Sequence, residues 1–172
     1  MAGGTGNHVL TGGASAVSLL PSVSNLDTEV QVTVGIDQLP AGNTYATAFA
    51  RRIGDASYGA RIRIGSGGDV ALHIVRGQGT TLTPLAGLTI PGQTYTPGDR
   101  LQIKVQAEGT GPTTIRAKVW TAGTPEPAAW TATTTDATTA LQGPGAIGVM
   151  TYLGGSAPRT ISWDNLWAAG IA

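Results

Sequence analysis

Residues 101–120 read LQIKVQAEGTGPTTIRAKVW, which is two alternating segments on either side of a turn. Both segments place an apolar residue at every second position, starting at Leu101 in the first and at Ile115 in the second. Successive side chains of a β-strand point to opposite faces, so this period of two predicts two strands that are each buried on one side. The glycines and the proline of residues 109–112 favour a turn between them.

The same alternation recurs along the rest of the chain. Residues 29–36, 58–64 and 70–75 each place apolar side chains on one face and polar ones on the other. Further short strands are expected at residues 9–11, 16–20, 44–52, 146–153 and 159–167. The threonine-rich stretch 129–140 is less regular and predicts a long surface connection. So many strands with one apolar face each predict either two sheets packed face to face or a barrel.

Composition supports an all-β chain that forms one domain. The 172 residues include 26 glycines and 10 prolines at turn-like intervals, which disfavours long helices. This length suits one domain with a sizeable core and is short for two. We expect residues 14–172 to form that domain, and residues 1–13, which are rich in glycine and small polar residues, to form a flexible arm.

Charge and cysteine content narrow the partners. Ten Lys and Arg residues balance ten Asp and Glu residues, which argues against binding to nucleic acid or to an anionic membrane. The absence of cysteine excludes disulfides, thiolate metal sites and cysteine nucleophiles. The sequence shows neither a signal peptide nor an apolar run that would span a membrane. We expect a virion or extracellular location, reached by a route other than a cleaved signal.

The sequence lacks the side-chain patterns of the common hydrolases. A glycosidase needs two carboxylates across the scissile bond, yet Glu29, Glu108 and Glu126 are the only glutamates, and no predicted strand carries two alternating acids. His8 and His73 are far apart, and no Gly-x-Ser-x-Gly motif is present. The sequence therefore predicts a protein that is not an enzyme.

Basic residues gather on the polar faces of the predicted strands. If those strands are neighbours in one sheet, the side chains form a basic stripe that suits an anionic glycan, a phosphate polymer or a partner protein. The alternative is that they are ordinary solvated residues that discourage strand-to-strand aggregation. The residues concerned are Arg61, Arg63, His73, Lys104, Arg116 and Lys118.

Four tryptophans are the next candidates for a binding site. Trp120 falls on the basic face and Trp130 follows it, and an indole is a common platform for a sugar ring. Tyr45 and Tyr152 are further aromatic residues for such a site. The alternative is that Trp120 and Trp130 pack their hairpin against the sheet, whereas Trp163 is expected in the core.

Several of these segments together resemble one fold family. The runs YGARIRI at residues 58–64, LQIKVQAEG at 101–109 and ISWDNL at 161–166, with the Trp120 to Trp130 hairpin, are similar to concanavalin A-like (laminin-G-like) modules. Such modules occur in actinobacterial secreted proteins and in tail proteins of phages that infect those hosts. The resemblance covers roughly residues 27–168. It implies a two-sheet antiparallel jelly-roll β-sandwich that is generally non-catalytic and often serves in glycan or surface adhesion.

The resemblance also implies one candidate metal ligand. Related modules often hold a structural calcium through an aspartate on the last strand, and Asp164 matches that position in kind. The alternative is that Asp164 and Asn165 only cap or bulge the terminal strand. No other cofactor is expected.

Three hypotheses for function follow. The first is a non-catalytic module of a phage tail or similar external assembly that binds carbohydrate or a host cell-surface polymer. The second is a structural or decorating virion protein that contacts neighbouring subunits, and for which a homo-oligomer is one arrangement. The third is an ancillary domain of a secreted actinobacterial enzyme.

Overall fold

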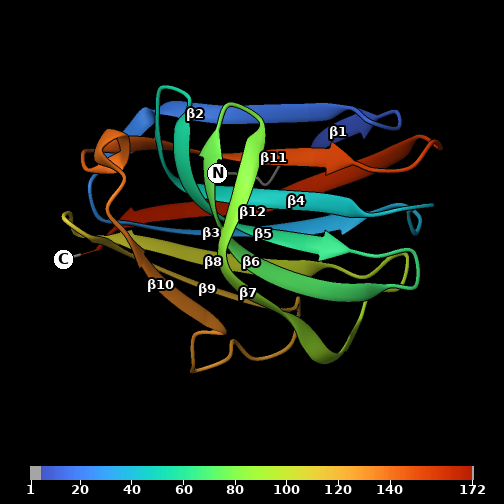
Figure 1. Cartoon of the computed structure of the whole chain (residues 1–172). Helices are drawn as coiled ribbons and strands as arrows, with labels where there is room; N and C mark the ends of the chain where they lie inside the picture. Colours follow the sequence, from blue (N-terminus) through green and yellow to red (C-terminus); the bar gives the residue numbers. More distant parts are fainter. Residues whose placement is uncertain (1–4, 172) are drawn as a thin grey trace.

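The computed structural model describes residues 5–171 as an all-β sandwich of two antiparallel sheets with six strands each (Figure 1). This confirms the predicted jelly-roll sandwich rather than a barrel. Sheet A has the order β1 (Gly6–Leu10), β12 (Arg159–Gly170), β3 (Thr28–Ile36), β8 (Leu101–Glu108), β9 (Thr113–Thr121), β10 (Ala132–Asp136). Sheet B has the order β2 (Ser15–Asn25), β11 (Gly145–Leu153), β4 (Thr44–Ile53), β5 (Ala56–Ile64), β6 (Asp69–Gln78), β7 (Thr81–Thr94). Residues 5–171 contain no helix that is long and apolar enough to cross a membrane.

The core lies between the two sheets and follows the alternation of the sequence. Val32 and Ile103 of sheet A and Ile62 of sheet B are fully buried, as the period of two predicts. Trp163 on β12 is 5% exposed, which confirms its predicted place in the core. Side chains at the intervening positions point to the outer faces, where any surface site on the strands must be built.

Two strands were missed by the sequence pattern, and both lie at sheet edges. Strand β7 contains Pro84 and Pro91, which cannot donate a backbone hydrogen bond but are tolerated on an edge strand with one neighbour. Strand β10 and the short 3-10 helix η1 (Thr139–Leu141) occupy the stretch 129–140 that was expected to be an irregular connection. An edge strand pairs with a neighbour along one side only, so its sequence is less constrained and alternates weakly.

Residues 6–10 are paired rather than free, which corrects the expected arm over residues 1–13. Strand β1 runs antiparallel to β12 at the edge of sheet A, with Gly6 opposite Trp163. His8 and Leu10 point inward and are buried, and this burial stabilises the segment against the sandwich. Residues 1–4 lie outside the described part of the chain.

One end of the sandwich is organised around a fully buried guanidinium. Arg51 on β4 is 0% exposed, and Asp27, at 3.9 Å, is the only carboxylate among residues 5–171 that pairs with it. Burial lowers the pKa of Arg51, and the charge of Asp27 opposes that effect. The guanidinium donates to the carbonyl oxygen of Leu26, that of Gly109 (3.2 Å), that of Leu141 (3.0 Å) and Thr113 Oγ1 (2.8 Å). A planar donor group of this size can serve several loops at once, so Arg51 ties this end together.

Candidate functional site

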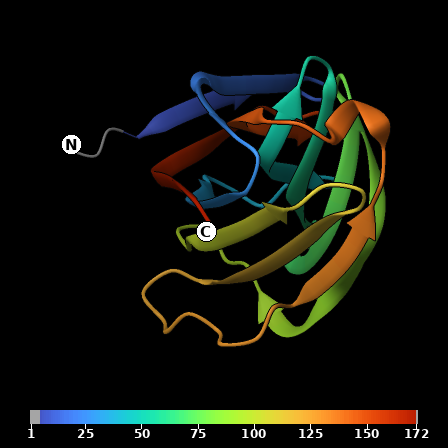
Figure 2. The ribbon, with the colours of Figure 1, turned by 90° about the vertical axis from the view of Figure 1, so that its left-hand side faces the viewer.

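The predicted basic stripe is divided between the two sheets. Arg61, Arg63 and His73 lie on β5 and β6 of sheet B, whereas the other three basic residues lie on β8 and β9 of sheet A. The outer faces of the two sheets point in opposite directions, with the core between the sheets, as the view in Figure 2 shows. The stripe is therefore wrong as a single surface, because alternation predicts which side of a strand is polar but not which sheet the strand joins.

On sheet A each of the predicted basic residues is paired with a glutamate. Lys104 Nζ lies 2.8 Å and Lys118 Nζ 2.6 Å from Oε1 of Glu126, and Lys104 also lies 3.4 Å from Glu29. Hydrogen bonds from both lysines lower the pKa of Glu126. Arg116 is paired with Glu108 at 2.6 Å. These three basic residues are therefore compensated by glutamates.

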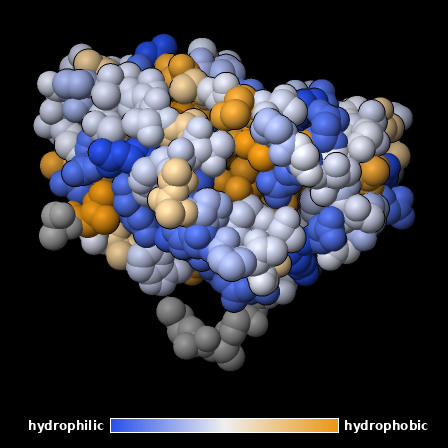
Figure 3. Space-filling view, turned by 90° about the horizontal axis from the view of Figure 1, so that it is seen from below, coloured by the Kyte–Doolittle hydropathy of each residue, from blue (hydrophilic) through white to orange (hydrophobic). Residues whose placement is uncertain are grey.

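The two tryptophans of the 120–130 hairpin take packing positions. Trp120 is only 7% exposed, and the segment 122–131 that joins β9 to β10 lies beside it. Trp130 is half-buried, and its ring lies 4.7 Å from the Lys118 ammonium. These contacts match the packing alternative. On the side of the molecule seen from below, apolar residues form small separate patches within a hydrophilic surface (Figure 3).

On sheet B the outer face contains a groove, which we call the sheet B groove. The β6–β7 hairpin bends over this face and passes in front of β4 in Figure 1. The cavity measures about 280 Å³, which suits one small ring with the rest of a ligand in the open groove. Its walls come from four strands and the hairpin, and they consist of Tyr45, Thr47, Arg61, Thr80, Leu82, Met150 and Tyr152.

Aromatic rings and a guanidinium meet inside the groove. The rings of Tyr45 and Tyr152 lie 5.9 Å apart on the neighbouring strands β4 and β11. The Arg61 guanidinium lies over the Tyr45 ring at 5.0 Å, which is a cation–π contact. Its one hydrogen bond within residues 5–171 is a long one, 3.5 Å to the carbonyl oxygen of Leu82. The groove therefore places the flat rings of two tyrosines beside the Arg61 guanidinium, whose hydrogen-bond donors have few partners among the described residues.

Arg63 and His73 flank the groove without lining it. Arg63 pairs with Asp69 and donates to Asn43 Oδ1 at 3.2 Å. His73 lies directly opposite Arg61 on β6, and its Nδ1 is buried without a hydrogen-bond partner among the described residues. Burial lowers the pKa of His73, and the charges of Arg61 and Arg63 lower it further. These effects favour the neutral form of His73 beside the two arginines.

Sequence reasoning found part of this groove and missed the rest. It named Arg61 directly and Tyr45 and Tyr152 as additions, but it grouped the tyrosines with Trp120, which lies on the other sheet. Leu82 was missed because β7 itself was missed. No local pattern in the sequence predicts that the β6–β7 hairpin bends over the sheet.

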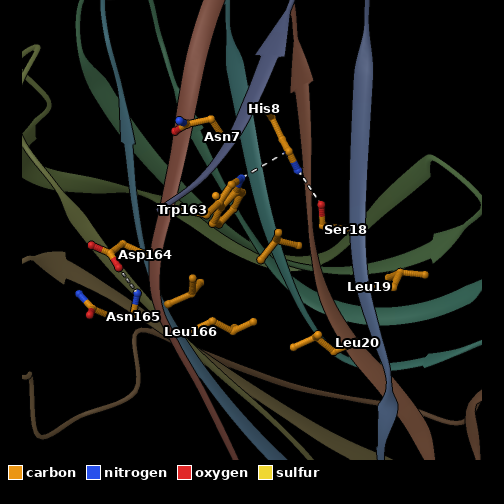
Figure 4. A pocket seen from close by; sticks show the side chains of 12 residues that line it. Asn7, His8, Ser18, Leu19, Leu20, Trp163, Asp164, Asn165 and Leu166 are labelled. Atoms are coloured by element: carbon orange, nitrogen blue, oxygen red, sulfur yellow. Dashed lines mark hydrogen bonds between the residues drawn. The ribbon is translucent and has the colours of Figure 1, made fainter. Parts of the chain in front are cut away.

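A second cavity, which we call the edge pocket, lies where the edge strands β1 and β2 meet (Figure 4). Its volume is about 350 Å³, and Leu20, Val149 and Leu166 make much of its wall apolar. His8 and Trp163 close one side of it.

The edge pocket contains a histidine and a serine that sequence reasoning did not bring together. His8 Nε2 lies 3.0 Å from Ser18 Oγ, and His8 Nδ1 lies 2.9 Å from Thr151 Oγ1. The indole N–H of Trp163 lies 3.3 Å from both His8 Nδ1 and Thr151 Oγ1, so these contacts fit either tautomer of His8. The groups at Nδ1 are a hydroxyl and an indole, and neither is the carboxylate that orients the histidine of a Ser-His-Asp triad. The pair serves to join the two edge strands.

Asp164, the predicted calcium ligand, lies at a bulge in β12. The pairing of β12 with β3 shifts register between Asp164 and Trp167, and Asn165 adopts a φ of 50° there. Asp164 Oδ1 accepts a hydrogen bond from the backbone N–H of Asn165 at 2.7 Å. Within residues 5–171 no group of three His, Asp or Glu side chains is placed to hold a metal ion. The geometry matches the bulge alternative, and calcium binding stays a prediction.

Comparisons with known proteins support the fold. No model of a known protein family matches the sequence, and no curated protein matches it. Among solved structures, a carbohydrate-binding module, CBM66 from Bacillus subtilis, is similar with a TM-score of 0.58 at 12% identity, covering 93% of this chain and 97% of that one. The carbohydrate recognition domain of Emp46p is similar with a TM-score of 0.60 at 9% identity, covering 99% and 89%. The alginate lyase Aly36B has a TM-score of 0.58 at 15% identity, covering 98% and 81%.

Proposed function

We propose that this chain is a non-catalytic carbohydrate-binding module that holds its ligand in the sheet B groove. The observation that carries the proposal is the placement of Tyr45, Tyr152 and Arg61 around one cavity. A pyranose ring has an apolar face that packs on an aromatic ring and a rim of hydroxyls that need hydrogen-bond partners. The tyrosine rings and the donor groups of Arg61 and Thr47 provide both.

Similar folds support this class of ligand. CBM66 and the Emp46p domain, which share the fold of this chain, are by their names carbohydrate-binding proteins. The fold also carries an alginate lyase, so the fold alone does not separate binding from catalysis. The lining of the sheet B groove supports binding over glycoside hydrolysis, which needs two carboxylates, because that lining includes none. All three glutamates are instead paired with basic residues on sheet A.

Binding to a glycan array with tyrosine variants tests the proposal. We expect Tyr45→Ala and Tyr152→Ala each to weaken binding by about 2- to 10-fold, because an aromatic contact contributes about 0.5–1.5 kcal/mol. Trp167→Ala is the matched control, since Trp167 is an aromatic residue 51% exposed on sheet A. Equal losses in all three variants, or no glycan bound by the wild type, would contradict the proposal.

The edge pocket favours a second candidate function, namely contact with another protein. Leu20 and Leu166 line the pocket and are 43% and 39% exposed, and Val9 and Trp167 on the adjoining strands are 73% and 51% exposed. Exposed apolar side chains gathered at one edge are typical of a protein interface. If this edge is the functional surface, Leu166→Asp abolishes co-assembly with a partner or with a second copy while leaving glycan binding intact.

The biological setting that we propose is an external assembly such as a phage tail, where the module attaches the particle to a host cell-surface polymer. The sequence resemblance to tail proteins supports this setting, and the edge pocket offers a place for contact with neighbouring virion subunits. The alternative setting is an ancillary domain of a secreted actinobacterial enzyme. Labelling of purified virions with an antibody to this chain separates the two.

A further inference from the structure

The sheet B groove contains a cation without a counter-ion. None of the carboxylates in residues 5–171 lies within 4.0 Å of the Arg61 guanidinium, although the neighbouring Arg63 is paired with Asp69 and Arg52 with Asp55. Arg61 is also half-buried, and its Nε has no hydrogen-bond partner in the described structure. A buried or half-buried charge is normally paired, so an anion bound beside Arg61 would stabilise the guanidinium.

The surroundings of Arg61 strengthen its attraction for an anion. The Tyr45 ring and the β6–β7 hairpin exclude part of the water from the guanidinium, and Coulombic interactions grow as water is removed. The partial burial also lowers the pKa of Arg61, because removal of water disfavours a charge that has no partner. An incoming negative group would relieve that cost.

We infer that the sheet B groove binds an acidic glycan, with the carboxylate of a uronic acid residue on Arg61 and its sugar ring against Tyr45 and Tyr152. The planar fork of a guanidinium matches a planar carboxylate with two parallel hydrogen bonds. A single uncompensated guanidinium suits one negative charge per bound residue. This inference rests on the proposed function, because it names the class of glycan for the same groove.

A comparison of uronate polymers with their neutral counterparts tests the inference. The probes are oligomers of polygalacturonate, alginate and glucuronate-containing glycans, each beside its own carboxyl-reduced form, with affinity measured by calorimetry. We expect at least one native oligomer to bind tenfold or more tightly than its reduced form. Arg61→Gln should remove this difference, and Arg61→Lys, which keeps the charge but loses the fork, should retain part of it.

The matched control is Arg116→Gln, because Arg116 is an arginine on the outer face of sheet A that already has a partner in Glu108. It should leave the preference for the acidic oligomer unchanged. Thermal melting of each variant separates lost binding from lost folding, and Arg61→Lys provides the result if Arg61→Gln does not fold.

Each other outcome overturns either this inference or the proposed function. Equal affinity for native and reduced oligomers overturns the acidic-glycan assignment and leaves the carbohydrate-binding proposal in place. Preference for a sulfated glycan over every uronate overturns the carboxylate assignment. Absence of binding to every glycan, acidic or neutral, overturns the proposed function itself.

Discussion

The outer faces of the two sheets both carry basic side chains, but they differ in how those charges are compensated. On sheet A, Lys104 and Lys118 share Glu126, and Arg116 has Glu108. On sheet B, Arg61 has a tyrosine ring and a distant carbonyl in place of a carboxylate. Each face carries three of the basic residues that the sequence pattern singled out, whereas the partners of Arg61 set it apart from the three on sheet A.

The difference teaches that an uncompensated charge marks a candidate binding site better than charge itself. A lysine within an ion-pair network has already exchanged its water for a protein carboxylate, and a ligand would have to displace that partner. An arginine that has lost part of its water without gaining a carboxylate still has binding energy to offer.

The largest expected effect comes from placing in the sheet B groove the carboxylate that its lining lacks. Tyr152→Glu places an acid in the cavity that Arg61 lines, at a position that is 39% exposed and tolerates a polar side chain. We expect it to weaken binding of an acidic oligomer by about 10- to 100-fold relative to Tyr152→Gln, since a hydrogen bond to a charged group contributes about 1.5–3 kcal/mol. Calorimetry on the pair of variants isolates the charge, and equal affinities would show that Arg61 is not the anion site.

A smaller effect should follow when sheet A loses its carboxylate. Glu126→Gln removes the anionic partner of the buried Lys118 ammonium, which keeps the carbonyl oxygen of Pro127 and the Trp130 ring, while Lys104 keeps Glu29. We expect the free energy of unfolding to fall by about 1 kcal/mol, measured by denaturant titration, because the exposed end of such a network is screened by solvent. The control is Glu108→Gln, which removes a more exposed pair and should change stability by less.

The smallest effect should be a difference in the pH range over which each face contributes stability. The pKa of His73 lies below its ordinary value of 6.5. The contribution of neutral His73 to the free energy of unfolding is therefore complete above pH 6.5 and falls as the pH drops below that value. The pKa of Glu126 lies below 4.5, so its contribution is complete above pH 4.5 and is lost at lower pH.

Unfolding curves across both ranges check this assignment. His73→Gln should flatten the dependence just below pH 6.5, where His8 also contributes because burial lowers its pKa. Glu126→Gln should flatten only the dependence below pH 4.5. Identical changes in both variants would mean that the two faces are not electrostatically separate.

Much of the fold can be predicted from the sequence, because the apolar residues at every second position of a strand are the ones that become buried. The inward positions of β5 and β8, from Ile62 to Ile103, are those that the period of two predicted. Turn residues placed most strand ends correctly. Edge strands such as β7 escaped because a strand with one neighbour tolerates proline and an irregular pattern.

The site was less predictable because it depends on contacts between segments far apart in the sequence. Local alternation put Arg61 and Lys118 on polar faces but could not assign them to different sheets. Trp120 sits at an outward position and is nevertheless buried by a connection that the pattern does not describe. The glycine-rich composition of residues 1–13 predicts an arm that includes His8, and only the closure of the sandwich brings His8 against Ser18 of β2 and Thr151 of β11.

The buried Arg51 has a consequence for motion. Its hydrogen bonds span sequence separations of 25, 58, 62 and 90 residues, so one side chain couples the chain segments before β3, between β8 and β9, and after β10. Opening any one of these segments leaves part of a buried charge unsolvated, which makes local opening costly. Backbone amides at this end should therefore exchange with solvent only when the whole domain unfolds, whereas the β6–β7 hairpin over the groove receives none of these Arg51 hydrogen bonds.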